Sequence, residues 1–141
     1  PNKTFREAII AAAQRGVTVE ILVPSDKIDS PFCRYASQNS WKALLEAGVR
    51  LYQYTPTMMH GKLMIADGLL SIIGSGNMDD RSFYINDEVN LHVLSSSFAK
   101  KQLAMYQRDL KQAEEITLTN LSDILAPLPH RLLARLVAPQ L

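Results

Sequence analysis

Hydrophobic positions in the first part of the chain alternate between helix-like and strand-like spacing. Apolar residues three or four apart, closed by a glycine, are typical of amphipathic helices, whereas short β-branched runs closed by a proline are typical of strands. Thr4 and Glu7 have the spacing of a capping box, which marks a helix start. The pattern predicts two helix–strand units, with helices at 5–15 and 33–47 and strands at 17–23 and 49–54.

The two helix–strand units repeat at a regular interval. Gly16 and Gly48 precede the two strands and lie 32 residues apart, about the length of a crossover that joins parallel strands. Because a parallel pair needs helices to cover it, the chain is predicted to be an α/β domain.

Beyond Pro56 the pattern changes to short alternating runs, which are typical of antiparallel strands. Asp67 and Gly68 are a strong signal for a hairpin turn between two of these runs. The strands are expected at 59–66, 69–74 and 88–94. Together with the parallel pair, they predict a mixed sheet flanked by helices.

The last part of the chain has helical spacing. An apolar stripe predicts a helix over 98–116, and leucines recur at similar spacing through 117–141. Arg131 and Arg135 lie beside these leucines. Basic residues next to an apolar face suit anionic lipid as well as solvent, so this helical tail is expected either to pack on the domain or to lie at a membrane interface.

Composition limits the class of protein. The chain has 141 residues, 47% of them hydrophobic, with 15 Lys and Arg against 14 Asp and Glu. These values predict one globular domain and exclude a disordered chain or a strongly basic nucleic-acid arm. The single cysteine excludes an intrachain disulfide, and no apolar stretch is long enough to predict a transmembrane helix.

His60 and Lys62 are the first candidates for chemistry. They lie two residues apart in a predicted strand, so their side chains should emerge from one face. A lysine ammonium repels a metal ion but attracts a phosphate oxygen, and a histidine can attack phosphorus or move a proton. The pair predicts an anion site, with no metal and no cofactor.

Three further residues can complete such a site. Ser75 and Asn77 stand in a glycine-rich turn, and both can donate hydrogen bonds to phosphate oxygens. Glu88 begins the alternating strand on its polar face. A carboxylate there can hold an imidazole in one tautomer and stabilise its charged form.

These residues resemble the signature of a known family. His60-Gly-Lys62, four residues, Asp67 and then Gly-Ser75-Gly-Asn77 are similar to the HxKxxxxD motif and G-S-x-N continuation of the phospholipase D superfamily. The segments at 79–83 and 86–91 resemble its cardiolipin synthase branch. The similarity covers essentially the whole chain, and it implies a phospholipase D-like fold.

The resemblance implies a two-step phosphatidyl transfer without a metal, through a phosphohistidine. Members carry two such motifs facing each other across one active site, and this chain resembles the C-terminal half. His60 would be the general acid and base, Lys62 and Asn77 would clamp the phosphate, Ser75 would be a supporting donor and Glu88 would orient His60. Asp67 belongs to the catalytic motif, although its place at a turn favours bracing the hairpin.

A physical argument agrees with a half-site. In-line displacement at phosphorus needs groups on opposite sides, and one histidine cannot stand in both places. The second histidine is expected from an N-terminal half that precedes Pro1, or else from a second copy related by twofold symmetry. Residues 1–116 are accordingly expected to be a C-terminal catalytic half-domain, incomplete at its N-terminus, and 117–141 its helical tail.

The expected partners follow from the same resemblance. They are an anionic phospholipid substrate, typically phosphatidylglycerol, and the surface of a bacterial inner membrane, on its cytoplasmic side or peripherally. A net charge of +1 argues against nucleic acid. The alternatives are another phosphodiesterase or a nuclease of the superfamily, and a scaffold half that is inactive when isolated.

Overall fold

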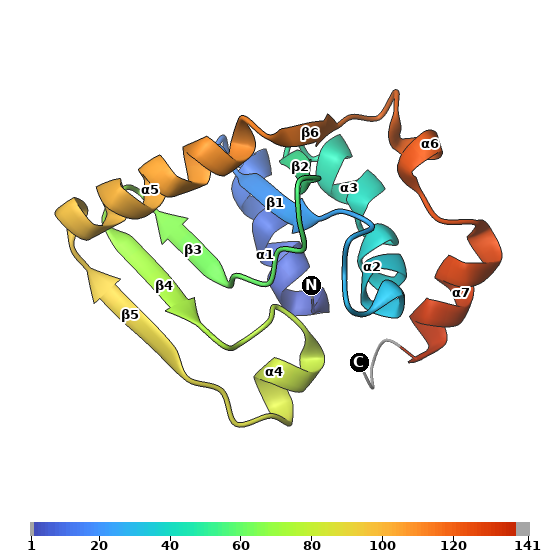
Figure 1. The fold of residues 1–141 in the computed structure, drawn as a ribbon, viewed down its shortest axis with the longest axis horizontal. Helices are drawn as coiled ribbons and strands as arrows, with labels where there is room; N and C mark the ends of the chain where they lie inside the picture. Colours follow the sequence, from blue (N-terminus) through green and yellow to red (C-terminus); the bar gives the residue numbers. More distant parts are fainter. Residues whose placement is uncertain (1, 138–141) are drawn as a thin grey trace.

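A computed structural model describes residues 2–137, whose strands form two three-stranded sheets with helices packed around them (Figure 1). The predicted α/β class is therefore confirmed. One sheet lies near the centre of the molecule and the other forms an arm to one side of it. The strands that the sequence predicts as one mixed sheet are thus divided between two.

The central sheet is mixed. β1 (Glu20–Pro24) pairs in parallel with β2 (Arg50–Tyr54), as predicted from the repeated helix–strand unit. β6 (Ala113–Ile116) pairs antiparallel with the other side of β2. The two parallel strands begin in register, and the Arg50 guanidinium lies 3.1 Å from the Glu20 carboxylate.

α1 (Lys3–Gln14) is the predicted first helix, but it is capped by a different residue. The Asn2 side chain accepts a hydrogen bond from the Phe5 amide at 2.9 Å, which makes Asn2 the N-cap. The capping box predicted at Thr4 and Glu7 is therefore wrong, because both residues already lie inside the helix. An asparagine close before the first apolar residue is the competing signal.

The strand predicted from residue 17 begins three residues later. Gly16 has a φ of 93°, which an L side chain rarely adopts, and the Val17 amide donates to the Ala12 carbonyl at 3.1 Å. These bonds close the C-terminus of α1, so residues 16–19 lead out of the helix before β1 starts.

The single helix predicted over 33–47 is wrong. The structure has α2 (Pro31–Gln38) and α3 (Trp41–Glu46), separated by a tight turn. The Ser40 hydroxyl donates to a carbonyl one turn back at 2.7 Å and stabilises this break. The change of direction points Trp41 into the core, where its side chain is buried.

The second sheet is antiparallel throughout. Its order is β3 (Leu63–Ala66), β4 (Leu70–Gly74) and β5 (Asn90–Leu94). The predicted turn between its first two strands is confirmed, since Asp67 and Gly68 have φ values of 53° and 61°. Two consecutive left-handed residues suit a tight hairpin turn.

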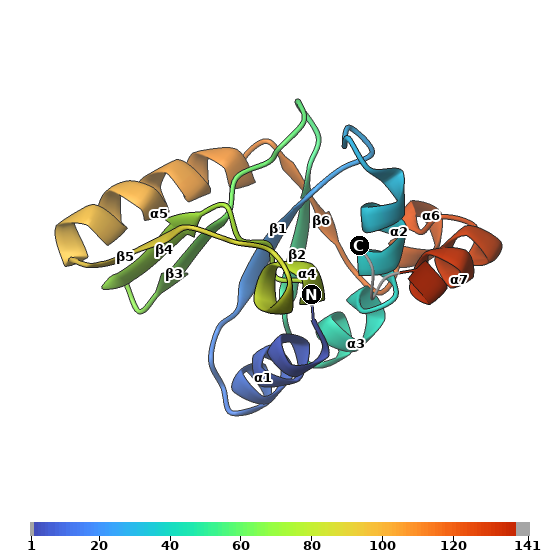
Figure 2. The same ribbon diagram turned by 90° about the horizontal axis from the view of Figure 1, so that it is seen from below.

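α5 (Ser96–Leu110) is shorter than the helix predicted over 98–116. It runs along the second sheet, as Figure 2 shows from below. Residues 113–116 leave the helical pattern and form β6 instead. Pairing with β2 places Ile116 in the core at 1% exposure, which outweighs the local helical preference of the two preceding glutamates.

The core lies on the central sheet and joins distant parts of the chain. Trp41, Leu51, Ile116 and Leu121 form one buried cluster. Leu121 comes from α6 (Leu121–Ile124), which leads to α7 (Leu128–Val137) beside α2. Among residues 2–137, no helix is both long and apolar enough to cross a membrane.

Replacing Leu51 with alanine should lower the free energy of unfolding by about 2–5 kcal/mol, because Leu51 is 1% exposed and its loss leaves a cavity. Urea denaturation measures the change. Leu94→Ala is the control, since this leucine is exposed and should alter stability by less than about 0.5 kcal/mol. Equal losses in the two variants would contradict this location of the core.

Candidate active site

His60 and Lys62 precede the second sheet, since β3 starts at Leu63. The strand expected from residue 59 therefore begins four residues later, although the Gly74 amide donates to the Lys62 carbonyl at 3.3 Å and extends the pairing by one residue. The Lys62 ammonium donates to the His60 carbonyl at 2.9 Å. This short bond folds the lysine side chain back over the histidine.

The two side chains meet. Lys62 Nζ lies 3.0 Å from His60 Nε2 and 3.1 Å from His60 Nδ1, with the donor and acceptor roles set by the tautomer. The histidine is exposed and the lysine is half-buried. A fixed positive charge thus stands beside a group that can take or give a proton, which is a suitable arrangement for a phosphate and its leaving oxygen.

Glu88 is at the centre of a hydrogen-bond network beside this pair. The Ser75 hydroxyl donates to Glu88 Oε2 at 2.5 Å, and the Ser82 hydroxyl donates to Oε1 at 2.7 Å. The Asn86 amide donates to Oε1 at 3.3 Å. Both carboxylate oxygens are thereby occupied, which fixes the orientation of Glu88.

These hydrogen bonds lower the pKa of Glu88. The Ser75 hydroxyl has the largest effect and the Ser82 hydroxyl the next, while partial desolvation opposes them. Asn86 and the positive charge of Lys62 lower the pKa further. Glu88 therefore remains a carboxylate at neutral pH, within the electrostatic influence of Lys62.

This network differs from the one expected of Glu88. Among the hydrogen bonds of residues 2–137, none joins Glu88 to His60, so the structure places no direct orienting contact between them. Ser75 likewise donates its proton to Glu88, and its oxygen accepts from the Val89 amide at 3.0 Å. In this arrangement Ser75 joins the loop after β4 to the segment before β5, whereas it was expected to donate to phosphate.

Asn77 and Asp67 lie at opposite ends of the hairpin. Asn77 follows β4, and its backbone amide is held by the Ser82 hydroxyl at 2.9 Å; it lines the extended open cleft that also includes His60, Lys62 and Asp67. Asp67 is in the turn beyond β3, five residues from Lys62, or about 16 Å along an extended strand. It lies in the turn, as its sequence position indicates, and not beside the histidine.

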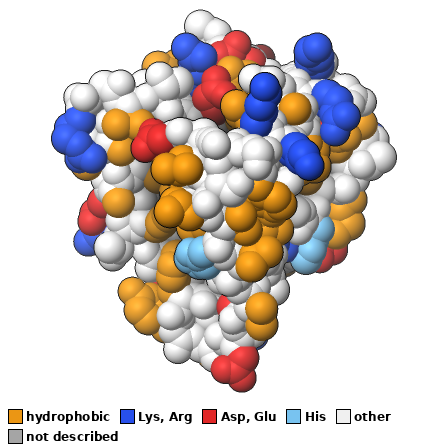
Figure 3. Space-filling view, turned by 90° about the vertical axis from the view of Figure 1, so that its left-hand side faces the viewer, with side chains coloured by type: hydrophobic (Ala, Val, Ile, Leu, Met, Phe, Trp, Pro, Cys, Tyr) orange, Lys and Arg blue, Asp and Glu red, His pale blue; other side chains and the backbone are white. Residues whose placement is uncertain are grey.

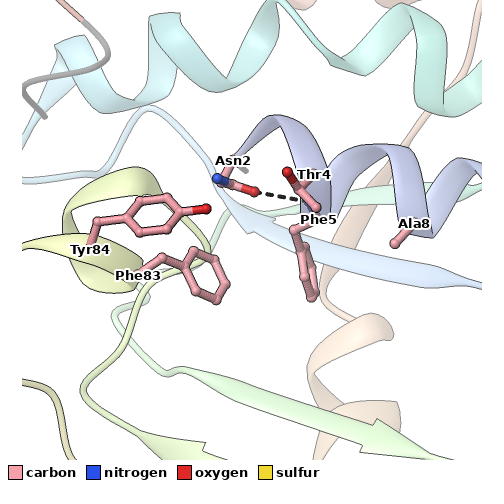
Figure 4. Close-up of a pocket in the computed structure, with 6 residues that line it drawn as sticks. All are labelled: Asn2, Thr4, Phe5, Ala8, Phe83 and Tyr84. Carbon is pink, nitrogen blue, oxygen red and sulfur yellow. Dashed lines mark hydrogen bonds between the residues drawn. The ribbon is translucent and has the colours of Figure 1, made fainter.

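The site opens into a broad cleft of about 1940 Å³ between the second sheet, α1 and β1. Figure 3 shows hydrophobic side chains gathered around histidines on the side of the molecule where the second sheet lies. A smaller hollow of about 220 Å³ lies between α1 and α4 (Asp80–Tyr84), and the rings of Phe5, Phe83 and Tyr84 line it (Figure 4). The described surface thus offers an aromatic hollow at α1 and α4 and a cleft of mixed polar and apolar lining at His60 and Lys62.

No group of three or more His, Cys, Asp or Glu in the described part of the chain is placed to hold a metal ion. The charged residues of the site lie instead as one basic pair and one bonded carboxylate. What this arrangement offers chemically is anion binding and proton transfer.

A family model described as "Cardiolipin synthase, PLD-like domain" matches residues 1–110. The chain belongs to this family. The match confirms the resemblance to the phospholipase D superfamily and to its cardiolipin synthase branch.

Curated relatives of the cardiolipin synthase family agree with this assignment. The chain is 38% identical to the minor cardiolipin synthase ClsB of Bacillus subtilis, over 86% of this chain and 30% of that protein. It is 41% identical to a Geobacillus cardiolipin synthase, over 82% of this chain and 23% of that protein. The chain therefore spans only about a quarter of the length of these relatives.

Two solved structures share the fold. Nuc of Salmonella typhimurium, a phospholipase D family member, has a TM-score of 0.73 at 21% identity, covering 82% of this chain and 75% of that one. The phosphatidylserine synthase of Haemophilus influenzae has a TM-score of 0.72 at 15% identity, covering 99% of this chain and 39% of that one. These likenesses concern the fold alone.

Sequence reasoning missed three polar residues of this cardiolipin synthase-like site. Ser82 and Asn86 bind Glu88, and the Asn90 side chain accepts from the Gly76 amide at 3.3 Å. Asp79 caps α4 through the Ser82 amide at 2.9 Å, and this Asp-x-x-Ser spacing is the signal that places Ser82. Asn90 lies two residues after Glu88, so the alternation along the strand places both side chains on one face, and this is the sequence signal for Asn90.

Gly74 allows the strands to meet closely beside the site. A Cβ there would lie 2.2 Å from both the Val89 carbonyl oxygen and the Asn90 side-chain oxygen. Only glycine therefore fits where β4 leaves the sheet, and the close approach brings Ser75 within reach of Glu88.

The Glu88 pKa should lie below its ordinary value of 4.5 and rise when Ser75 is replaced by alanine. Ser82→Ala should raise it less, because the Ser82 bond has the smaller effect. NMR titration of the carboxyl carbon measures each value. Since the folded pKa is lowered, this carboxylate stabilises the fold above about pH 4.5, and the contribution is lost as pH falls through the folded pKa.

Ser122→Ala is the matched control for that titration, because Ser122 donates to another carboxylate, that of Asp123, on α6. It should leave the Glu88 pKa unchanged. An unaltered pKa in Ser75→Ala would show that the Ser75 hydroxyl does not stabilise the carboxylate.

Proposed function

We propose that this chain supplies one half of the active site of a phosphatidyltransferase that makes cardiolipin from two phosphatidylglycerol molecules and releases glycerol. The observation that carries the proposal is the contact between His60 and Lys62, at 3.0 Å, in a chain of the cardiolipin synthase family. The other half would bring a second histidine, from another part of a longer protein or from a second copy.

The proposed reaction has two steps. The second histidine attacks the phosphorus of one phosphatidylglycerol, so that a P–N bond forms and the P–O bond to glycerol breaks, while His60 protonates the leaving oxygen. His60 then accepts the proton from a glycerol hydroxyl of the second phosphatidylglycerol. That oxygen attacks phosphorus, the P–N bond breaks, and cardiolipin leaves with both histidines restored.

Lys62 and Asn77 are proposed to hold the phosphate during both steps. The lysine charge offsets the negative charge that remains on the phosphodiester oxygens, and the exposed Asn77 faces the same cleft. In this proposal the reaction needs no metal ion, because Lys62 supplies the positive charge.

The hydrogen bonds of Glu88 lead to a different proposed role from the one expected from the sequence. Its bonds to Ser75 and Ser82 make it a positioning residue for the glycine-rich loop that carries Asn77. Its charge also acts on Lys62, whose ammonium contacts His60. Glu88 would therefore orient the site through these neighbours and not through the imidazole directly.

The surface beside the site supports a lipid substrate. Phe83, Tyr84 and Ile85 are exposed directly after Ser82, and the hollow of Figure 4 is lined by aromatic rings from α1 and α4. A nucleic-acid phosphodiester would call for a positively charged surface, whereas the net charge is +1. A bacterial membrane surface is accordingly the proposed place of action.

The edge of the second sheet supports a missing partner for the site. β5 is an edge strand, and both Leu91 within it and Val89 just before it are exposed. Another half or a second copy packed on these exposed apolar side chains would bury them.

His60→Ala should lower the rate of phosphatidyl transfer by about 10²–10⁴-fold in the assembled enzyme, because the general acid and base is lost. The assay follows cardiolipin formed in phosphatidylglycerol vesicles. His130→Ala is the control, since His130 packs against Tyr35 with ring centroids 5.7 Å apart and does not line the cleft. Normal turnover in His60→Ala would exclude the proposed role.

The 141-residue chain should give no transfer as a monomer and should gain activity when a second histidine motif is supplied. Size-exclusion chromatography combined with the transfer assay tests this, with and without an added N-terminal half from a full-length relative. Transfer by a verified monomer would contradict the half-site. Cleavage of DNA without lipid transfer would replace the proposed function with that of a nuclease.

A further inference from the structure

We propose that α7 docks this chain on an anionic lipid surface, with a row of leucines inserted and the domain held above. The face in question consists of four exposed leucines, namely Leu128, Leu132, Leu133 and Leu136. The docking is a second lipid contact, separate from the cleft that holds His60. The docking proposal depends on the proposed function only in taking the lipid to be anionic.

The opposite face of α7 is fixed to the domain. Ala134 is completely buried, and α7 packs along α2. Leu132 and Leu136 each lie two residues from Ala134, so they are rotated from it by about 200° and face away. The exposed leucines are therefore the outer side of an attached helix.

Polar contacts hold α7 in this position. The Asn39 side chain donates to the Arg131 carbonyl at 3.1 Å, and Arg131 Nε donates to the Ala126 carbonyl at 3.1 Å. Gln38, buried at the end of α2, donates to the Ile124 carbonyl at 3.3 Å and accepts from the Ala126 amide at 2.9 Å. These bonds fix the turn that precedes the helix, so the leucine face has a defined orientation.

The charge of the residues around α7 indicates what binds to the leucine face. Residues 124–141 contain Arg131 and Arg135 and no Asp or Glu, whereas the rest of the chain has a slight acidic excess. A helix that has an apolar face, and whose sequence contains basic residues and no acid, is complementary to a bilayer of anionic lipid. A partner protein could cover the leucines equally well, but it would not require this local separation of charge.

The length of α7 favours lying along the surface. Its ten residues span about 15 Å, half of the hydrocarbon thickness of a bilayer. His130 lies four residues before Ala134 and therefore on the packed side of α7, where its ring contacts Tyr35 of α2 with centroids 5.7 Å apart and helps to hold the helix against the domain.

Sedimentation of the 141-residue chain with vesicles tests the proposal. We expect binding to vesicles that contain phosphatidylglycerol and weaker binding to pure phosphatidylcholine. The double variant Leu132→Ser/Leu136→Ser should bind at least about tenfold more weakly. Leu69→Ser/Leu94→Ser is the matched control, because these leucines, in the turn before β4 and at the end of β5, are 45% and 74% exposed against 49% and 78% for the α7 pair.

The outcomes separate the alternatives. Undiminished binding by the α7 variant, absent binding by the wild type, or equal binding to neutral vesicles would each overturn the proposal. Loss of self-association in the α7 variant with unchanged vesicle binding would assign the face to a contact between copies instead, and also overturn it. Thermal unfolding checks that both variants are folded.

Failure of the proposed function is distinguishable from failure of the docking. His60→Ala removes the proposed general acid and base but leaves α7 intact, so it should bind vesicles as the wild type does. A chain that docks but supports no transfer when the second histidine motif is supplied would contradict the proposed function alone. A chain that supports transfer and fails to dock would contradict the α7 proposal alone.

Discussion

The Glu88 carboxylate joins three segments that the chain brings together from different places. Ser75 comes from the loop after β4, Ser82 from α4, and Glu88 itself from the residues before β5. Hydrogen bonds to a charged group are stronger than those between neutral groups. Here two of them hold the glycine-rich loop against the Glu88 carboxylate. The position of Asn77 depends on this closure, because its amide is held by the same Ser82 hydroxyl.

The site combines a small charged centre with aromatic side chains nearby in the chain. Lys62 and His60 are in contact, and Phe83 and Tyr84 follow directly after Ser82 on α4. A phospholipid has the same division, with one anionic phosphate and long apolar chains. The exposed leucines of α7 lie on another part of the surface, so the two proposed lipid contacts are separate, one at the proposed catalytic residues and one away from them.

Much of the fold could be predicted from the sequence wherever local signals and tertiary contacts agree. The parallel strands, the hairpin at Asp67 and Gly68, and the first helix all follow from period, turn chemistry and glycine position. The break between α2 and α3 could not be predicted, because Gln38 is held there by Ile124 and Ala126, 86 and 88 residues away. β6 likewise replaced a predicted helix because β2 offered a pairing partner for Ile116.

The sequence by itself determined the family and the residue types of the site, since His60, Lys62, Asp67, Ser75 and Asn77 have motif spacing that is independent of packing. Only the tertiary structure decided their contacts. Glu88 has three partners within hydrogen-bond reach, and they come from a helix and loops whose positions depend on long-range packing. The alternation of side chains along a strand specifies the face on which a residue lies. It does not specify which neighbouring side chains will contact that residue.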